Sequence, residues 1–427
     1  MKYLLIIIKA YLLLSLFSAN FSYASKKQPL PLEDYFQEIW TTHDGLPHNS
    51  IHALTQTKDG YIWIATWEGL VRFNGREFKV FPRISALGLP SAGVLSLATK
   101  ADGSLLVAGA RGGISERKNR HWLAHKPVGS MVNDIIYDNE QGYWLSPENE
   151  GVIYRDVVNQ QDTLIIPKAM VYDFLQEGNK IWVATSTGLY YIENKKEVKH
   201  YGVDEGVPLI HIYKLLITSK KELILATEKG LYIRKDQQFI PFISQLRDKR
   251  IYTTFQDSND DIWIGTMNYG LYRLSSRGLE HLDDKDGLPH NRVSIIYQDQ
   301  ENSIWVGTNS GLLRLREAPF VTLTTKQGLQ GNYIRTVMSH DNGSLWVGSS
   351  KGLNKIDGRK ITSITTNKPI YVLSLAKGKQ GEVFVGTYNQ GLFKVVDDKL
   401  QSLDLLNRQL KSKKSDLFFM TAKITYG

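Results

Sequence analysis

The 427-residue chain contains no cysteine, so disulfide bonds and thiol chemistry are excluded and the fold must be held by packing alone. Long apolar runs are also scarce: only Tyr3 to Phe17 approaches membrane-spanning length, and Lys9 interrupts it. Common catalytic and nucleotide-binding motifs are missing too, because neither H-E-x-x-H nor G-x-x-x-x-G-K occurs and no G-x-S-x-G forms a nucleophile elbow. The formal net charge of +9 is scattered rather than gathered in a stripe, which argues against nucleic-acid binding.

The apolar run at the N-terminus follows Met1-Lys2 directly. Ser22-Tyr23-Ala24 comes after it and supplies small residues where a signal peptidase would cut. This arrangement predicts a secretory signal peptide at residues 1–24, with an uncleaved signal anchor as the alternative. We interpret residues 25–35 as a polar linker and expect an exported, periplasmic protein.

One repeated stretch accounts for most of what the chain does contain. Residues 303–312 read S-I-W-V-G-T-N-S-G-L: an apolar strand with one large aromatic, a small residue, Thr and then Gly-Leu. The pattern returns at intervals of 38 to 43 residues along nearly the whole chain. The aromatic position is occupied in turn by Trp63, Leu106, Trp144, Trp182, Ile224, Trp263, Trp305, Trp346 and Phe384. A fixed period near 40 with strand-like units is typical of a propeller.

Each copy reads as four antiparallel strands. An alternating or apolar strand leads to a turn rich in Asp, Asn and Gly, and the aromatic strand, a Gly-containing turn and two further strands follow. The aromatic strand is apolar on both faces, as expected when neighbouring blades cover each sheet on both sides. We therefore predict an all-β chain of propeller blades. We assign a role in the blade cores to Trp63, Trp144, Trp182, Trp263, Trp305, Trp346 and Phe384.

With these motifs the sequence resembles the two-component regulator propeller family, the extracytoplasmic sensor region of bacterial signalling receptors. The family repeat has a Gly-Leu-Pro-x-Asn lead-in, an Asp/Gly turn, Trp-Ile/Val-Gly-Thr and Gly-Leu. Here it runs from Gly45 to Leu70 and from Gly287 to Leu312, and the resemblance covers about residues 36 to 400. It implies two successive seven-bladed propellers, ligands such as oligosaccharides and, for a full-length relative, a homodimer.

A lone strand precedes the first repeat. Phe36 to Thr42 has no repeat of its own, whereas the seventh copy ends at Arg316 without its outer strand. A strand supplied from the N-terminus would close the ring and remove an open sheet edge. We therefore predict a closed seven-bladed propeller at residues 36–316.

The later repeats read as an incomplete second propeller. Residues 317–400 are predicted to form its first two blades, and residues 401–427 part of a further blade, truncated at Gly427. Nothing in the sequence resembles a histidine-kinase ATP site, a phospho-acceptor receiver or a diguanylate cyclase. The chain thus looks like the front portion of a longer receptor, whose membrane contact would come from an uncleaved anchor or a missing C-terminal span.

Metal-binding signals are weak. His43, His48 and His52 lie close together without fixed ligand spacing, and Asp257 to Asp261 lacks the Gly and distal Glu of an EF-hand. We interpret the histidines as solvated or capping residues and the acidic stretch as a hairpin turn, and we expect neither metal nor cofactor.

Propeller geometry predicts one binding face. The loop into each inner strand and the loop between second and third strands open on the same side, while the opposite side carries mostly short turns. Candidate ligand contacts on the first side are His48, Trp67, Glu68, Arg111, Glu148, Tyr269, His290 and Arg292. Trp67 and Tyr269 would stack on a sugar ring while charged neighbours orient its polar groups; the alternative is that they are isolated surface residues.

Two function classes remain. The favoured one is a non-catalytic periplasmic sensor of a small molecule or oligosaccharide, with a kinase or cyclase output elsewhere. The alternative is a secreted propeller enzyme acting on carbohydrate, sialidase- or lyase-like, in which paired carboxylates converge on one face. No carboxylate recurs at the face positions, which favours the sensor.

Overall fold

A computed structural model describes residues 29–81, 93–100, 102–138, 142–159, 161–208, 210–317, 322–358, 360–364 and 369–409. Within this part the protein is all-β, with nine four-stranded antiparallel sheets, short 3-10 helices and the short helix α2 (Asp404–Gln409). The chain divides into two compact units, Met1–Ala318 and Pro319–Gly427. No helix in the described ranges is long and apolar enough to span a membrane. The signal peptide expected at residues 1–24 lies outside those ranges.

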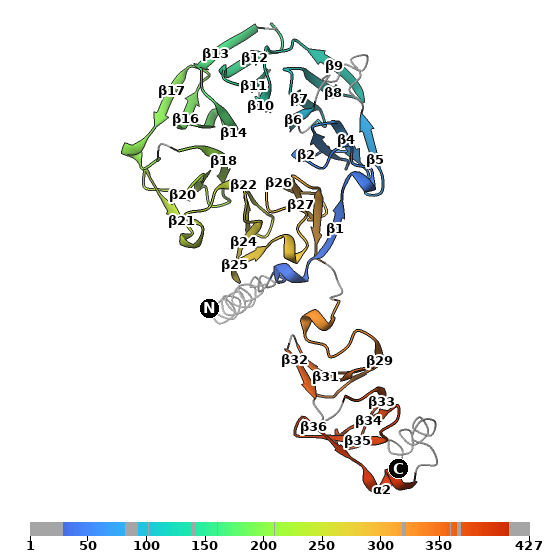
Figure 1. Cartoon of the computed structure of the whole chain (residues 1–427). Coiled ribbons are helices and arrows are strands. Elements are labelled where there is room, and N and C mark those ends of the chain that lie inside the picture. Colours follow the sequence, from blue (N-terminus) through green and yellow to red (C-terminus); the bar gives the residue numbers. More distant parts are fainter. Residues whose placement is uncertain are drawn as a thin grey trace, which may run out of the picture. The chain divides into compact units, whose positions relative to one another are not determined.

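Seven sheets of the first unit stand around a common axis with their first strands innermost (Figure 1). Blade 1 contains β2 (Ile51–Gln56), β3 (Ile62–Thr66), β4 (Gly69–Phe73) and β5 (Phe78–Phe81). Blade 2 contains β6 (Val94–Thr99), β7 (Leu105–Gly109), β8 (Ile114–Lys118) and β9 (His121–His125). Blade 3 contains β10 (Val132–Tyr137), β11 (Gly142–Pro147), β12 (Gly151–Asp156) and β13 (Gln161–Pro167).

The remaining blades follow in chain order. Blade 4 contains β14 (Val171–Glu177), β15 (Lys180–Thr185), β16 (Gly188–Glu193) and β17 (Glu197–Tyr201). Blade 5 contains β18 (Ile212–Ile217), β19 (Leu223–Thr227), β20 (Gly230–Lys235) and β21 (Gln238–Phe242). Blade 6 contains β22 (Ile251–Gln256), β23 (Ile262–Thr266), β24 (Leu271–Ser275) and β25 (Gly278–Leu282). Blade 7 contains β26 (Val293–Gln298), β27 (Ile304–Thr308), β28 (Leu312–Arg316) and β1 (Phe36–Trp40). Each inner strand contacts the next around the ring, and β26 contacts β2.

The second strand of each blade forms the core. Almost every residue of β3, β7, β11, β15, β19, β23 and β27 is buried. The six tryptophans assigned to this position are 0–5% exposed across both units, whereas Phe384 is only half-buried. Burial of such rings dominates the stability of the blades.

Aspartates in the acidic turns accept hydrogen bonds from two of these tryptophans. The indole Nε1–H of Trp263 donates to Asp257 Oδ2 (2.8 Å), and that of Trp305 donates to Asp299 Oδ2 (2.7 Å). The other oxygen of Asp257 accepts the backbone N–H groups of Asn259 and Asp261. The interpretation of residues 257–261 as a hairpin turn is therefore confirmed.

The Gly-Leu-Pro-x-Asn motif caps a 3-10 helix. In the first copy, η2 (Thr42–Asp44) ends at Gly45, whose φ of +105° is left-handed, and Asn49 Oδ1 accepts the Thr42 N–H (2.7 Å). Leu46 is then buried between the blades. Equivalent helices are η6 (Asp284–Asp286) and η7 (Thr325–Gln327); η1 (Leu32–Asp34), η4 (Val203–Glu205) and η5 (Ser244–Leu246) complete the set in the described ranges.

The closing strand is β1. It pairs antiparallel with β28, from Phe36 opposite Arg316 to Trp40 opposite Leu312, so the predicted closure is confirmed. The Trp40 ring stacks on Trp305 with centroids 5.4 Å apart. The partly buried Trp40 anchors this register, and the pairing removes the free edge of β28.

The expected linker 25–35 is wrong for its described part. Leu32 and Tyr35 are buried in the same cluster as the blade 6 core. Arg273, itself fully buried, donates to the Tyr35 hydroxyl (2.9 Å) and to the Leu30 carbonyl (2.5 Å). Because a buried guanidinium needs partners, this contact fixes the segment to the ring.

The second unit has two described sheets. One contains β29 (Ile334–Ser339), β30 (Leu345–Ser349), β31 (Gly352–Asp357) and β32 (Lys360–Ile364). The other contains β33 (Val372–Lys377), β34 (Val383–Thr387), β35 (Leu392–Val396) and β36 (Lys399–Ser402). The boundary expected at residue 400 falls inside β36, and α2 follows instead of a further strand. Residues 410–427 lie outside the described ranges.

Candidate functional site

Every inner strand of the ring carries a β-bulge at the same place. The first residue of the strand is a buried Ile or Val. The second residue has no partner in the pairing between the first and second strands of the blade. The skipped residues are His52, Leu95, Asn133, Tyr172, Tyr213, Tyr252 and Ser294. Bulges re-aim side chains, and here they present one residue per blade where the loops lead into the inner strands.

Three of these residues are neighbouring tyrosines. The ring centroids of Tyr172 and Tyr213 are 5.1 Å apart, and those of Tyr213 and Tyr252 are 5.5 Å apart. The Tyr172 hydroxyl lies 3.0 Å from Nδ1 of His211. Blades 4, 5 and 6 thus place their rings side by side on the predicted binding face.

Arg292 continues this row into blades 7 and 1. Its guanidinium carbon lies over the Tyr252 ring, 5.4 Å from the centroid. Its positive charge also acts on His52, which packs edge-on against Trp67 with centroids 4.6 Å apart. We call the whole group the aromatic arc; it consists of His52, Trp67, Tyr172, His211, Tyr213, Tyr252 and Arg292.

Two buried nitrogens of the arc have no hydrogen-bond partner among the described residues: Arg292 Nε and His52 Nε2. The Arg292 guanidinium also forms no ion pair within the same ranges of the chain. An unpaired buried polar group costs about 1–3 kcal/mol, so such groups normally have partners. The junction of blades 7 and 1 therefore offers hydrogen-bonding capacity that the fold itself does not use.

Charges of both signs act on the arc. Burial, with smaller contributions from Tyr213 and Tyr252, raises the pKa of Tyr172 to about 12, so its phenol stays protonated at neutral pH. Burial likewise raises the pKa of Tyr213; Glu228 raises it further, whereas Arg250 and Arg292 lower it. Glu228 lies in the β19–β20 turn. A carboxylate thus acts on Tyr172 and Tyr213, while a guanidinium lies against Tyr252.

The structure brings part of the predicted site to this arc. Trp67 and Arg292 belong to it, and His48 contributes to the lowered pKa of His52. His290 joins it indirectly, because its Nδ1 accepts the backbone N–H of Arg292 (2.9 Å).

The other predicted residues lie elsewhere on that face. Tyr269 lies under the ammonium of Lys249, 3.8 Å from its ring centroid. Arg111 and Glu148 lie in turns of blades 2 and 3, which supply no member of the arc. Glu68 follows Trp67 in the β3–β4 turn.

The tyrosines were missed because only the aromatic second strands were aligned. A signal was present in the first strands, where Val171-Tyr172, Ile212-Tyr213 and Ile251-Tyr252 repeat a β-branched residue followed by Tyr. Aligning the repeats on the buried β-branched residue would have placed the three tyrosines at one register.

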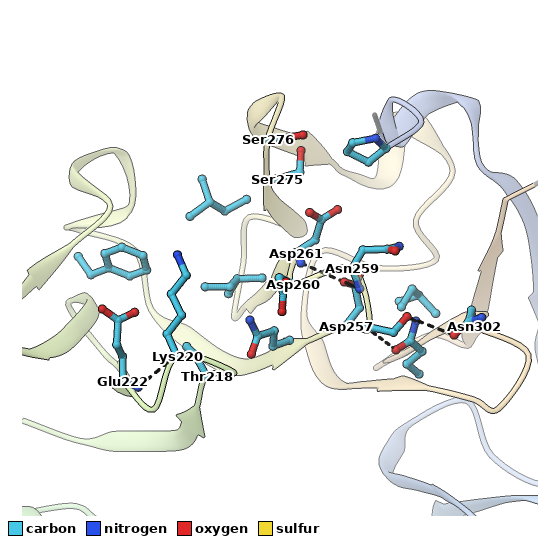
Figure 2. Close-up of a pocket in the computed structure, with 18 of the residues that line it drawn as sticks. Thr218, Lys220, Glu222, Asp257, Asn259, Asp260, Asp261, Ser275, Ser276 and Asn302 are labelled. Carbon is cyan, nitrogen blue, oxygen red and sulfur yellow. Dashed lines mark hydrogen bonds between the residues drawn. The ribbon is translucent and has the colours of Figure 1, made fainter. Parts of the chain in front are cut away.

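The opposite face carries the expected short turns, and a cleft lies among them. This cleft has a volume of about 1210 Å³ and lies against blades 5, 6 and 7 and the segment from Pro29 to Tyr35. Figure 2 shows Lys220 and Glu222 on one side of it and the turn from Asp257 to Asp261 on the other.

Most polar groups of this cleft already stabilise the ring. Asp257 holds its own turn and Trp263. Gln298 reaches from blade 7 to blade 6, where its Oε1 accepts the Ser258 N–H (2.9 Å) and its Nε2 donates to the Ser258 hydroxyl (3.1 Å). Gln256 forms the same bridge to Ser219 of blade 5. Because these groups are occupied, we assign the cleft a structural role and retain the aromatic arc as the candidate site. No cluster of three or more His, Asp or Glu suited to a metal occurs in the described ranges.

His52 should make the first unit less stable in acid. Burial, with smaller contributions from the neighbouring His48 and Arg292, lowers its pKa to about 4. Between pH 6.5 and 4, His52 is therefore protonated in the unfolded chain but not in the folded one. The free energy of unfolding falls as the pH falls through this range. The full difference corresponds to about 3 kcal/mol.

The measurement is denaturant unfolding near pH 7.5 and near pH 4.5 for wild type and His52→Asn. We expect the wild type to lose roughly 2–3 kcal/mol more than the variant on acidification. Other titrating groups cancel in this difference, and His43→Asn, at an exposed histidine, should follow the wild type. Equal losses in wild type and His52→Asn would refute the assignment.

Comparison with known proteins agrees with the fold and its repeats. The family profile described as "Two component regulator propeller" matches residues 45–68, 245–268 and 287–310. The extracellular domain of BT3049 from B. thetaiotaomicron, described as a hybrid two component system, is 21% identical, with a TM-score of 0.71 over 85% of this chain and 53% of that one. The corresponding domain of BT4673 from the same organism is 18% identical, with a TM-score of 0.56 over 86% of this chain and 53% of that one.

Virginiamycin B lyase from Staphylococcus aureus shares the fold at 12% identity, with a TM-score of 0.54 over 66% of this chain and 100% of that one. No curated protein matches the chain. The chain spans about half the length of the two extracellular domains. The structural likenesses show the fold, and the profile matches show the repeat type. The protein is therefore a β-propeller that carries two-component regulator propeller repeats.

Proposed function

We propose that this chain is the ligand-sensing region of a periplasmic or extracellular bacterial signalling receptor, and that ligand binds at the aromatic arc. The observation that carries the proposal is the match of three repeats to the two-component regulator propeller family. The fold likeness to extracellular domains of receptors so described supports it. Signal output, by a kinase or a cyclase, would be the task of a separate domain.

The geometry of the ring suits binding. A closed ring of blades holds its loops on a rigid scaffold, and binding residues are commonly carried on such loops. Five blades contribute to the arc, so a ligand there would contact much of the ring at once. The lyase likeness concerns the fold alone and does not favour an enzymatic reading.

A sensor should bind its ligand and leave it unchanged. We expect a thermal-shift screen of the 427-residue protein against sugars and small organic acids to find compounds that raise its melting temperature. At 100-fold excess over the dissociation constant, a ligand adds about 2.7 kcal/mol of stability. Chromatography of each hit after prolonged incubation should return the starting compound.

The matched variant is Tyr213→Ala, which removes the central ring of the arc. A genuine ligand should lose most of its shift in this variant. Conversion of a hit by the purified protein would show an enzyme and refute the sensor proposal.

A further inference from the structure

We propose that the aromatic arc recognises a ring that carries a single carboxylate, with the carboxylate on Arg292 and the ring on Tyr213 and Tyr252. This inference rests on the proposed function and names the ligand class for the same site.

The carboxylate of the ligand is inferred from the unpaired guanidinium of Arg292. Its guanidinium forms no ion pair with the described residues, and its buried Nε has no acceptor there. His52 Nε2 is equally unpaired, and the charge of Arg292 acts on His52. A guanidinium presents a planar fork of donors that matches a carboxylate, and such charge-assisted pairs are among the strong hydrogen bonds. One anionic oxygen pair would satisfy nitrogens that the fold leaves without partners.

The ring follows from the tyrosines. Tyr213 and Tyr252 lie with centroids 5.5 Å apart and ring planes inclined by 32°, and Tyr172 extends the row. Adjacent tyrosines supply large apolar faces with hydroxyl groups at their edges, which suits a flat or chair-shaped ring bearing polar substituents. Arg292 already lies against Tyr252, so a ring on the tyrosines would carry its acid group within reach of the guanidinium.

The single charge is inferred from Glu228. Its backbone N–H donates to the carbonyl of His211 in the arc (3.1 Å), and its carboxylate acts on both Tyr172 and Tyr213. Its carboxylate would repel a second anionic group but accept hydrogen bonds from ligand hydroxyls. Arg250 acts on Tyr213 together with Arg292, so the net charge around the central ring favours one negative charge on the ligand.

Two sources share this chemistry, a uronic-acid sugar and a hydroxylated aromatic acid. The test is calorimetric titration of the full 427-residue protein with methyl β-glucuronide, its neutral counterpart methyl β-glucoside, and 4-hydroxyphenylacetate. We expect at least one acid to bind, and the acid that binds identifies the source. We expect Arg292→Gln to weaken its binding at least tenfold, because a charge-assisted hydrogen bond is lost.

The variants separate the possible sites. Arg292→Lys keeps the charge but not the fork and should fall between wild type and Arg292→Gln. Arg76→Gln, at an exposed arginine in the β4–β5 turn, should bind as the wild type does. Lys220→Gln probes the cleft on the opposite face. Unchanged melting temperatures show that the variants are folded.

Three results would overturn the inference: no acid bound at millimolar concentration, equal binding of the neutral glucoside where the glucuronide binds, or binding lost in Lys220→Gln but kept in Arg292→Gln. Failure of the acids while the thermal-shift screen yields another ligand would leave the sensor function standing. Conversion of a bound acid would refute the sensor function and leave the recognition chemistry intact.

Discussion

Replacing Trp305 with alanine should lower the free energy of unfolding of the first unit by roughly 3–5 kcal/mol, the cost of truncating a large buried aromatic. Trp305 is 1% exposed and packs between the ring of Trp40 and the core of blade 1. Its loss leaves a cavity and removes the donor that satisfies Asp299. Denaturant unfolding followed by circular dichroism measures the change.

The matched control is Trp67→Ala, because Trp67 is 41% exposed. Its truncation removes less buried surface and leaves no enclosed cavity, so it should cost clearly less than the loss of Trp305. Equal destabilisation by both variants would contradict the role of the second strand as the blade core.

The blades were predictable because their signal is local. Each copy places one large ring, one hairpin turn and one Gly-Leu step within a few residues, and Trp63 and Trp263 occupy equivalent positions without tertiary information. Closure by β1 was predictable from the strand count. The N-terminal strand belonged to no repeat, and the seventh repeat lacked its outer strand. Both inferences needed only the period and the cost of an open edge.

The aromatic arc was only partly predictable because it depends on the bulges. A bulge shifts the register by one residue, and a one-residue shift reverses the face to which a side chain points. The alternation of β22 alone therefore does not show that Tyr252 lies beside Tyr213. Trp67 and Arg292, in contrast, lie in loops whose side of the ring follows from topology.

Burial also depends on neighbours that a repeat does not specify. Ile51 and Leu54 of β2 are 0% and 6% exposed. Their counterparts in β29, Ile334 and Val337, are 37% and 58% exposed, although both strands follow the same capped motif. In the first unit blade 7 covers this face. Burial of these apolar side chains therefore contributes more to the free energy of unfolding in the first unit than in the second.

The N-terminal segment could not be assigned from its composition. It reads as polar and proline-containing, yet Leu32 and Tyr35 are buried with the blade 6 core. The partner that fixes it, Arg273, lies more than two hundred residues away. Only the assembled ring brings that guanidinium to the segment.

Removing this segment together with β1 should abolish the ring. A chain that begins at Thr41 lacks Leu32, Tyr35 and Trp40, and burial of three such side chains contributes roughly 5–9 kcal/mol. It also leaves Arg273 without the Tyr35 hydroxyl and Arg314 without Glu38, which now bonds its guanidinium at 2.6 and 2.9 Å. This loss is comparable with the whole stability of a typical domain, about 5–15 kcal/mol.

We therefore expect the chain that begins at Thr41 to lack a cooperative unfolding transition and to aggregate through the open edge of β28. The control chain begins at Pro29 and keeps every described contact of the segment, so it should unfold as the full-length protein does. Size-exclusion chromatography and thermal unfolding of the two chains, prepared side by side, measure the difference. A monomeric chain from Thr41 with an unchanged melting temperature would mean that the seven blades hold together without their closing strand, and that the ring is stabilised by contacts between inner strands alone.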